Sequence, residues 1–379
     1  MSYALTEEQQ LIQQSAREFT REYIEPIATE MDRTGIHPST VVQQMAEHDF
    51  LGLYLPEEFG GAGAGYLSYV LIIEEISRMS GAVASILINH ASLAAYAMYR
   101  FGSAVQKQEY LPALCSGEKL AAFALTEPGA APGVGSHKVI ATKEGDHYVL
   151  NGHKCYVANG GVADIYVVFA LTNPEAGAKG MSAFIVGAKA AGLSIQRTIG
   201  KMGLRGCQSA ELIFENVMVP QSNLLGAEGA GMTIAKEAQL VASVTEGAQV
   251  VGIAQAAMED AVKYGKQRVQ FGRPIAAFPA IQTMLAEMAT HIHIARLAVY
   301  DAASLIEKGE DFMKEAAMVK LFTGRIGQSA LIDVIQIEGG YGYSQEMIAS
   351  RFYRDIKGAV ITESSAAFPE KVIADDLLA

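Results

Sequence analysis

The residues best suited to chemistry lie between Gln336 and Ser365. This stretch begins with a Gln-x-x-Gly-Gly turn, continues through Arg351 and Arg354, and then reaches the carboxylate of Glu363. Glycines have no side chain and therefore let the backbone approach a ligand closely. Glu363 follows an apolar segment, where desolvation favours the protonated form of a carboxylate and suits it to act as a general base. The spacing predicts a cofactor-dependent active site in this stretch.

Composition excludes several classes of function. The 379 residues carry a formal net charge of −12, which argues against nucleic acid or an anionic membrane as partner, because both require clustered Lys and Arg. No run approaches the roughly 18 to 20 apolar residues of a membrane span, so we expect no membrane insertion. The opening residues lack the basic and apolar regions of a secretory signal, and we expect a cytoplasmic protein. The three cysteines form no Cys-x-x-Cys pair and are expected to be buried, reduced thiols.

Apolar periodicity predicts helices in the first part of the chain. The predicted segments are 5–31, 39–48, 66–79, 83–101 and 104–116. Pro26 lies inside the first segment and should kink or split it. We therefore expect a helical domain over residues 1–118.

The pattern changes after residue 118 to short segments rich in β-branched and aromatic residues, separated by turns. Strands are predicted at 120–126, 138–143, 147–158, 165–171, 181–186 and 211–214, a spacing typical of a small antiparallel barrel or sandwich. From residue 232 apolar residues follow a helical period, which predicts a bundle of four long antiparallel helices. The expected fold class is α+β, with an antiparallel β domain at 119–231 and a helical bundle at 232–379.

The chain resembles the acyl-CoA dehydrogenase family over essentially its whole length. Besides the stretch described first, the motifs that carry the resemblance are FALTEPGA (123–130), YVANGGVAD (156–164), KMGLRG (201–206), VPQSNLLGAEGAG (219–231) and KQRVQFGRPI (266–275). The resemblance implies that family's fold and a flavoprotein with FAD as cofactor. It also implies oxidation of an acyl-CoA thioester to its 2,3-enoyl form, transfer of electrons to an electron-transfer flavoprotein, and assembly into a tetramer.

This reaction requires a base, because the α-proton of a thioester is only weakly acidic and the enolate oxygen needs hydrogen-bond donors. In the family the base lies nine residues after the Arg of an Arg-Asp pair. The pair here is Arg354 and Asp355, so the resemblance implies that Glu363 is the catalytic base. The implied donors to the enolate oxygen are the backbone N–H of Glu363 and a ribitol hydroxyl of the flavin.

The resemblance also implies two groups of cofactor-binding residues and a substrate-binding group. The bundle would hold the pyrophosphate and adenine of a neighbouring subunit's FAD through Arg268, Gln270, Phe271, Gln336, Gly339 and Gly340. The other cofactor positions are Phe123, Leu125, Thr126, Tyr156, Ala158 and Ser365. The substrate positions are Tyr96, Pro132 and Ser243. No metal is implied.

Several of these positions depart from the family pattern. The family's Gly-Ser-Asp loop reads Ala-Pro-Gly at 131–133, and Pro132 cannot donate a backbone hydrogen bond. Tyr156 replaces an indole that backs the flavin, and Ala158 replaces a threonine. The family's Asp-x-x-Arg pair is Leu240 and Ser243 here. These changes predict an unusual substrate pocket.

Two residues bear on the acyl group. Tyr96 stands where the family commonly has glycine, near the acyl end of the tunnel, and its ring predicts a short or compact substrate. The arginine found in enzymes for dicarboxyl-CoA is Ala84 here, which argues against a glutaryl-type substrate.

Other polar residues are interpreted as structural. Glu246 is the alternative base, but we interpret it as an exposed helix residue. Glu127 is interpreted as a turn residue and His90 as a packed polar residue at a helix–helix contact. His291 and His293 point to different faces of a helix and predict no metal pair.

Three functions remain open from the sequence. The first is FAD-dependent dehydrogenation of a short, compact or cyclic acyl-CoA, or the reverse reduction, by a homotetramer that exchanges electrons with an electron-transfer flavoprotein. The second is a non-catalytic or flavin-poor subunit of a hetero-oligomeric dehydrogenase. The third is a non-redox elimination on a CoA thioester.

Overall fold

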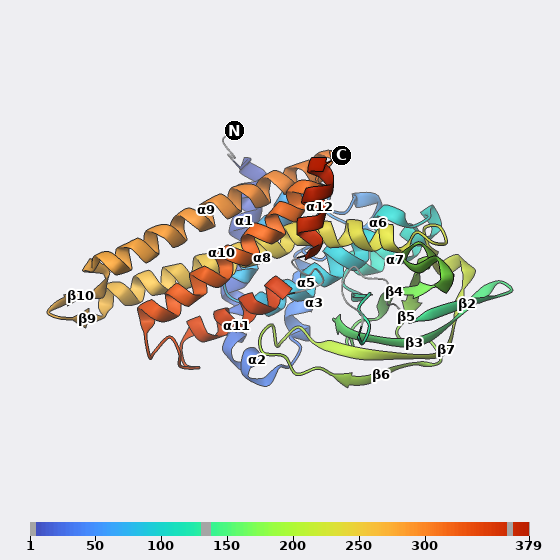
Figure 1. The fold of residues 1–379 in the computed structure, drawn as a ribbon, viewed down its shortest axis with the longest axis horizontal. Helices are drawn as coiled ribbons and strands as arrows, with labels where there is room; N and C mark the ends of the chain where they lie inside the picture. Colours follow the sequence, from blue (N-terminus) through green and yellow to red (C-terminus); the bar gives the residue numbers. More distant parts are fainter. Residues whose placement is uncertain (1–4, 130–137, 362–366, 379) are drawn as a thin grey trace.

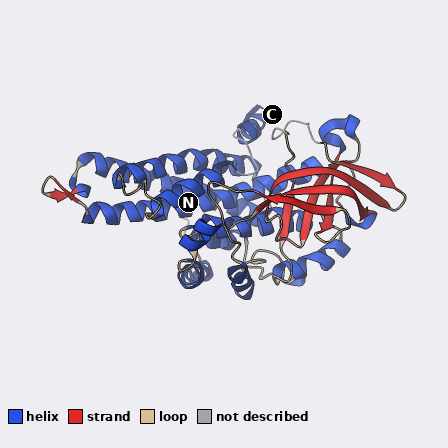
Figure 2. Ribbon diagram, turned by 90° about the horizontal axis from the view of Figure 1, so that it is seen from below, coloured by secondary structure: helices blue, strands red, loops and turns tan. Residues whose placement is uncertain are grey.

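The computed structural model describes residues 5–129, 138–361 and 367–378. The molecule is elongated, with long helices reaching one end and a β-sheet at the other (Figures 1 and 2). Amino-terminal helices join the two parts. Helix α4 (Tyr66–Ser77) packs on α8 (Gly231–Gln267) of the bundle, and the π-helix η3 (Ile88–Ala95) packs on β1 (Ala121–Ala124) of the sheet. The expected fold class is confirmed.

The predicted amino-terminal helices are present. Their bounds are α1 (Glu7–Phe19), α2 (Ala28–Thr34), α3 (Ser39–Glu47), α4 (Tyr66–Ser77), α5 (Gly81–Leu87), the π-helix η3 (Ile88–Ala95), α6 (Tyr96–Phe101) and α7 (Ala104–Cys115). A capping box begins α1, where Thr6 accepts from the N–H of Gln9 and the Gln9 side chain accepts from the N–H of Thr6. The chain leaves the helix around Pro26, so the predicted split between α1 and α2 is confirmed.

One helical stretch differs from expectation. Gly81–Phe101 runs through α5, η3 and α6 and is long and apolar enough to cross a membrane, whereas the sequence predicted no such run. Its most apolar window is entirely buried inside the protein. Core helices of ordinary globular domains have the same composition, because they are hydrophobic all round.

The sheet is mixed, whereas the sequence predicted an antiparallel one. Its main path runs β6-β7-β3-β2-β4-β5-β8, and β1 pairs with β4 in parallel. Strand β6 was not predicted, because its residues are nearly all exposed and show no alternation. The strands are β1 (Ala121–Ala124), β2 (Ile140–Glu144), β3 (His147–Ala158), β4 (Ile165–Leu171), β5 (Met181–Gly187), β6 (Leu193–Thr198), β7 (Ser209–Pro220) and β8 (Leu224–Leu225).

Long helices form the rest of the molecule, as predicted. They are α8 (Gly231–Gln267), α9 (Pro279–Lys308), α10 (Met313–Glu338), α11 (Ile348–Ile361) and α12 (Ala367–Leu378). A two-stranded hairpin of β9 (Val269–Gln270) and β10 (Arg273–Pro274) joins α8 to α9 at the far end of the bundle (Figure 1). Close contact of α8 with α4 requires Gly252, because a Cβ there would lie 2.2 Å from the carbonyl oxygen of Glu74.

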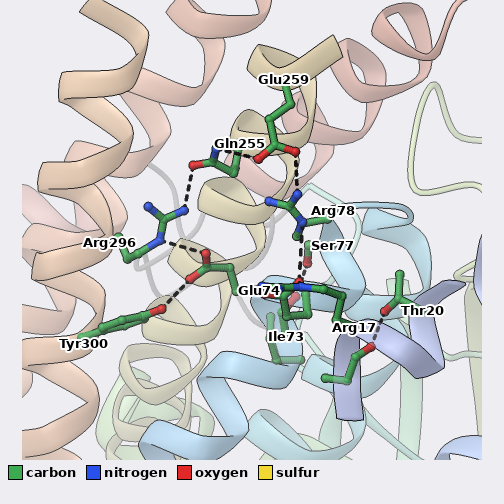
Figure 3. A network of polar contacts seen from close by, with 12 residues as sticks. Arg17, Thr20, Ile73, Glu74, Ser77, Arg78, Gln255, Glu259, Arg296 and Tyr300 are labelled. Atoms are coloured by element: carbon green, nitrogen blue, oxygen red, sulfur yellow. Dashed lines mark hydrogen bonds and ion pairs between the residues drawn. The ribbon is translucent and has the colours of Figure 1, made fainter. Parts of the chain in front are cut away.

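A polar network crosses this contact (Figure 3). The buried carboxylate of Glu74 accepts hydrogen bonds from Arg296 Nε at 2.9 Å and from the Tyr300 hydroxyl at 3.0 Å, both on α9. The neighbouring Glu75 pairs with Arg17 of α1 at 2.8 Å. A buried carboxylate is stable only when cations and donors compensate its lost hydration. These pairs therefore fix α1 and α9 onto α4.

We predict that Arg296→Leu lowers the free energy of unfolding by about 3 kcal/mol, because it leaves the Glu74 carboxylate buried without its cation. Denaturant unfolding measures this loss. The matched control is Arg33→Leu, which removes an exposed i,i+3 pair with Glu30 and should leave stability unchanged. Equal effects of the two substitutions would contradict a structural role for the network.

Candidate active site

A cavity of about 580 Å³ lies at the tip of the bundle. Arg268, at the end of α8, and Gln270 of β9 face it, together with Gly339 and Gly340 after α10. Gly339 has φ +61°, and a side chain added at either glycine would meet no atom within 4 Å. The backbone there borders open space, which allows a ligand to approach it closely. The structure thus brings four of the six predicted bundle residues together.

The other two predicted bundle residues lie beside this cavity and do not line it. Phe271 is 92% exposed, and Gln336 is exposed on α10. Tyr341 and Tyr343 are also exposed apolar side chains at the same tip. A single chain therefore presents several aromatic rings to solvent around a polar cavity. Exposed patches of this kind are typical of surfaces that bind a ligand or a partner chain.

Glu338 lines the same cavity and was not predicted as a site residue. Its side chain is 2% exposed, and among the described residues neither carboxylate oxygen has a hydrogen-bond partner. Burial and the negative charge of Asp260 raise the pKa of Glu338 to about 7. Its position inside the Gln-x-x-Gly-Gly motif was the available signal, but its burial could not be read from the motif.

The predicted cofactor positions of the β domain lie on and beside β1 and β3. Tyr156 is 62% exposed and has φ +55°, at an irregularity between Lys154 and Val157 where β3 changes register with β7. Phe123 is fully buried in the core, with its ring 4.7 Å from that of Phe169, so only its backbone is available to a ligand. The exposed ring of Tyr156 is the side chain here that is able to stack on a planar cofactor.

Leu125 and Thr126 connect this surface to a buried ion pair. The Leu125 carbonyl accepts from Lys154 Nζ at 2.9 Å, and the Thr126 carbonyl accepts from the N–H of Cys155 at 2.9 Å. Lys154 also pairs with Glu127 at 2.6 Å, and both side chains are buried. The interpretation of Glu127 as a simple turn residue is therefore wrong. Glu127 also accepts the N–H of Val139, so it links β1's exit to the residues that lead into β2.

Three sequence predictions lie outside the described residues. Pro132 belongs to segment 130–137, while Glu363 and Ser365 belong to segment 362–366. Ala158 is half-buried at the end of β3. The base and one substrate contact therefore remain sequence-based predictions.

The residues around the end of α11 correct one sequence interpretation. Glu246 on α8 is buried, not exposed, and its carboxylate pairs with Lys320 Nζ of α10 at 2.5 Å. Lys320 also donates to the carbonyl oxygen of Ala359 at 3.1 Å. Because α11 ends at Ile361, this contact fixes the helix end that leads to residue 363. Glu246 is thus neutralised by a buried cation.

Arg351 and Arg354 bind within their own chain. Arg351 donates to the Met79 carbonyl at 3.0 Å, and Arg354 forms a two-point ion pair with Asp32 of α2. Asp355 accepts the N–H of Leu204 at 2.7 Å, and burial raises the pKa of Asp355 to about 6. These residues anchor α11 to the amino-terminal helices and to the β domain.

Tyr96 faces a second cavity, of about 460 Å³. Its hydroxyl donates to Glu237 at 2.9 Å, and Arg100 pairs with the same carboxylate. Ser243 is buried on α8, and its hydroxyl donates to the Gln239 carbonyl at 2.8 Å rather than lining this cavity. Tyr96 and Ser243 therefore lie on neighbouring helices, but only the Tyr96 side chain lines the cavity.

The predictions for His90 and for the burial of the cysteines agree with the structure. His90 is buried and bonds to the Leu114 carbonyl through Nε2 and to the N–H of Ala121 through Nδ1, as a packed polar residue should. His291 and His293 are exposed, and no cluster able to hold a metal occurs in the described ranges. All three cysteines are buried.

The two groups of cofactor residues lie apart in the molecule. The tip cavity adjoins β9 and β10 at the far end of the bundle, whereas Tyr156 belongs to β3 of the sheet, away from that tip (Figures 1 and 2). A cation, an amide and bare glycine backbone fit a pyrophosphate, and an exposed tyrosine fits a flavin ring. The residues present thus fit FAD, but in two halves.

Comparison with known proteins identifies the family of the chain. Family models for the N-terminal, middle and C-terminal domains of acyl-CoA dehydrogenase match residues 6–118, 122–217 and 229–378. An acyl-CoA dehydrogenase of Bacillus subtilis (strain 168) is 44% identical over 374 residues, 99% of each chain. An acryloyl-CoA reductase (NADH) of Anaerotignum propionicum is 43% identical, over 100% of this chain and 96% of the relative.

Two further comparisons agree. A subunit of the caffeyl-CoA reductase-Etf complex of Acetobacterium woodii is 37% identical, over 98% of this chain and 99% of the relative. The structure of butyryl-CoA dehydrogenase from Megasphaera elsdenii superposes with a TM-score of 0.98 at 38% identity, and the match covers 100% of both chains. The chain therefore belongs to the acyl-CoA dehydrogenase family of FAD-dependent oxidoreductases.

Proposed function

We propose that this enzyme interconverts a short, compact or cyclic acyl-CoA and its 2,3-enoyl-CoA. In one direction Glu363 removes the α-proton while the β-hydride leaves, and in the other the same groups reduce the double bond. Relatives named as an acyl-CoA dehydrogenase and an acryloyl-CoA reductase support both directions. The relative from a reductase-Etf complex supports an electron-transfer flavoprotein as the redox partner.

The separation of the two cofactor-binding halves is the observation that carries this proposal. Arg268, Gln270 and the paired glycines form a cradle at the bundle tip, and Tyr156 lies near the end of β3 in the sheet, away from that tip. One chain is too extended to close both halves around one dinucleotide. We propose that the tip binds the pyrophosphate and adenine of a neighbour's FAD within a homotetramer. The exposed Phe271 beside the cradle supports burial of the tip by another copy.

FAD, when bound, supplies the hydride acceptor for the oxidation. Tyr156 would stack on the flavin ring and orient it, and Arg268 would neutralise pyrophosphate charge. Glu363 would hold the α-proton, and its backbone N–H would donate to the enolate oxygen. Lys320 donates to the Ala359 carbonyl and so fixes the last turn of α11.

Substrate size is governed in this proposal by the cavity around Tyr96. Its ring is 7% exposed, and the hydrogen bond to Glu237 holds it in one position, so it would not swing aside for a long acyl chain. The bulk of Tyr96 supports a short or compact acyl group.

We predict that the purified protein carries stoichiometric flavin and that a short acyl-CoA bleaches its absorption anaerobically. Glu363→Gln should retain the flavin and slow bleaching by about 10² to 10⁴, the usual contribution of a general base. The control Glu246→Gln should retain bleaching, since Glu246 is bound to Lys320. If Glu246→Gln bleaches slowly and Glu363→Gln does not, Glu246 is the base. Absence of flavin after gentle purification would favour the flavin-poor subunit.

Sharing of the cofactor site between chains predicts complementation. Arg268→Glu should lose FAD through charge repulsion, and Glu363→Gln should lose turnover. When the two inactive chains are refolded together, a site that combines the intact Glu363 of one chain with the intact Arg268 of the other should be active. Random pairing across a two-fold interface should restore about a quarter of the wild-type activity. If both halves came from one chain, the mixture would remain inactive.

A further inference from the structure

Glu338 is a buried carboxylate without a compensating group in the described part of the chain. It is the last residue of α10, where the helix dipole disfavours a negative charge. It is 2% exposed, and neither oxygen receives a hydrogen bond. Asp260 adds a like charge nearby, and burial and this charge raise the pKa of Glu338 to about 7. A buried carboxylate without a hydrogen bond lowers the stability of the folded chain, so its presence indicates that a ligand or partner group supplies the missing donor.

The partner must be a hydrogen-bond donor that enters the cavity. Arg268 lines the same cavity but donates no hydrogen bond to either carboxylate oxygen of Glu338. Apolar and aromatic side chains also line the cavity around the carboxylate, among them Ile337, Tyr264 and Tyr341. A phosphate offers only acceptor oxygens at neutral pH and would be repelled by a carboxylate, whereas Arg268 suits it. A neutral N–H or O–H group is what Glu338 is suited to bind.

The adenosine half of a dinucleotide has such donors. Tyr264 and Tyr341 both line the cavity, with ring centroids 6.4 Å apart and ring planes tilted by 52°, and Ile275 adds an apolar surface. Aromatic and apolar walls accommodate a purine, and a buried acceptor among them selects a base or sugar that presents a donor. Glu338 is thus placed to orient the adenosine half of the ligand, while Arg268 attracts its negatively charged pyrophosphate.

We propose that Glu338 is a further cofactor-binding residue, which accepts a hydrogen bond from the adenosine half of FAD, either from the adenine amino group or from a ribose hydroxyl. The inference rests on the proposed function, because that function assigns the tip cavity to a neighbour's FAD. It explains why an acceptor occupies a site that the chain leaves without a donor of its own.

The test compares the holoenzymes of the wild type, Glu338→Gln and Glu338→Leu. Dilution releases flavin, and the rise in its fluorescence gives the dissociation constant. Glu338→Leu should weaken FAD about tenfold, as expected for loss of a hydrogen bond to a charged group, with Glu338→Gln in between. If the carboxylate were only an uncompensated charge beside the pyrophosphate, both substitutions would tighten FAD or leave it unchanged, which would overturn the proposal.

Glu346→Gln is the matched control. Glu346 lines the same cavity but is exposed, so its substitution removes an equal charge without removing a buried acceptor. It should leave FAD binding unchanged or slightly tighter. A loss as large as that of Glu338→Leu would show that charge in the cavity, rather than the Glu338 contact, governs affinity, and would overturn the proposal.

Exchange of the bound flavin against analogues identifies the donor. FMN lacks adenosine, so the wild type and Glu338→Leu should bind it equally, and an equal loss with FMN would overturn the proposal. Flavin hypoxanthine dinucleotide lacks the adenine amino group. If the difference between wild type and Glu338→Leu disappears with this analogue, the amino group is the donor. If the difference persists, a ribose hydroxyl is the donor.

Two outcomes separate this inference from the proposed function. A wild-type protein that binds no FAD would contradict the proposed function itself. In the second case the wild type binds FAD, but the Glu338→Leu variant dissociates into smaller assemblies before any flavin is released. A partner chain, rather than adenosine, would then supply the donor to Glu338. Light scattering during the dilution detects this second case and would overturn the contact with adenosine.

Discussion

The close contact between α4 and α8 is the constraint on which the rest of the structure depends. Gly252 lets the two backbones touch, and the ion pairs of Glu74 and Glu75 then tie α9 and α1 to the same helix. Helix α8 has 37 residues and therefore spans about 55 Å. Because it is held rigidly, Glu246 near its middle and the Arg268 cradle after its end stay far apart. The proposed division of the cofactor site between chains is consistent with this length.

Local patterns in the sequence predicted most helices and strands but not how they pair. Strand β6 was missed because it is exposed on nearly all residues, so its sequence shows no alternation. The parallel pairing of β1 with β4 was missed because strand order is set by tertiary packing. The buried states of Glu127 and Glu246 were misjudged for the same reason, since each depends on a lysine distant in sequence.

The candidate site was predictable where residue identity alone carries the chemistry. The glycines after α10, Arg268 and Gln270 do meet at one cavity, as their motifs indicated. Phe123 shows the opposite case, because a motif position can lie near a site while its side chain packs in the core. Glu338 was overlooked because burial without a partner is a property of the folded chain, and no spacing rule describes it.

The exposed aromatic tip has a consequence for how enzyme accumulates in a cell. Before assembly a chain presents Phe271, Tyr341 and Tyr343 to solvent next to a polar hollow. Such a surface is a target for chaperones and for aggregation, and in the proposed assembly another copy and a dinucleotide would cover it. Subunit supply and flavin supply would then jointly limit the amount of mature enzyme, so riboflavin status would act on protein abundance as well as on turnover.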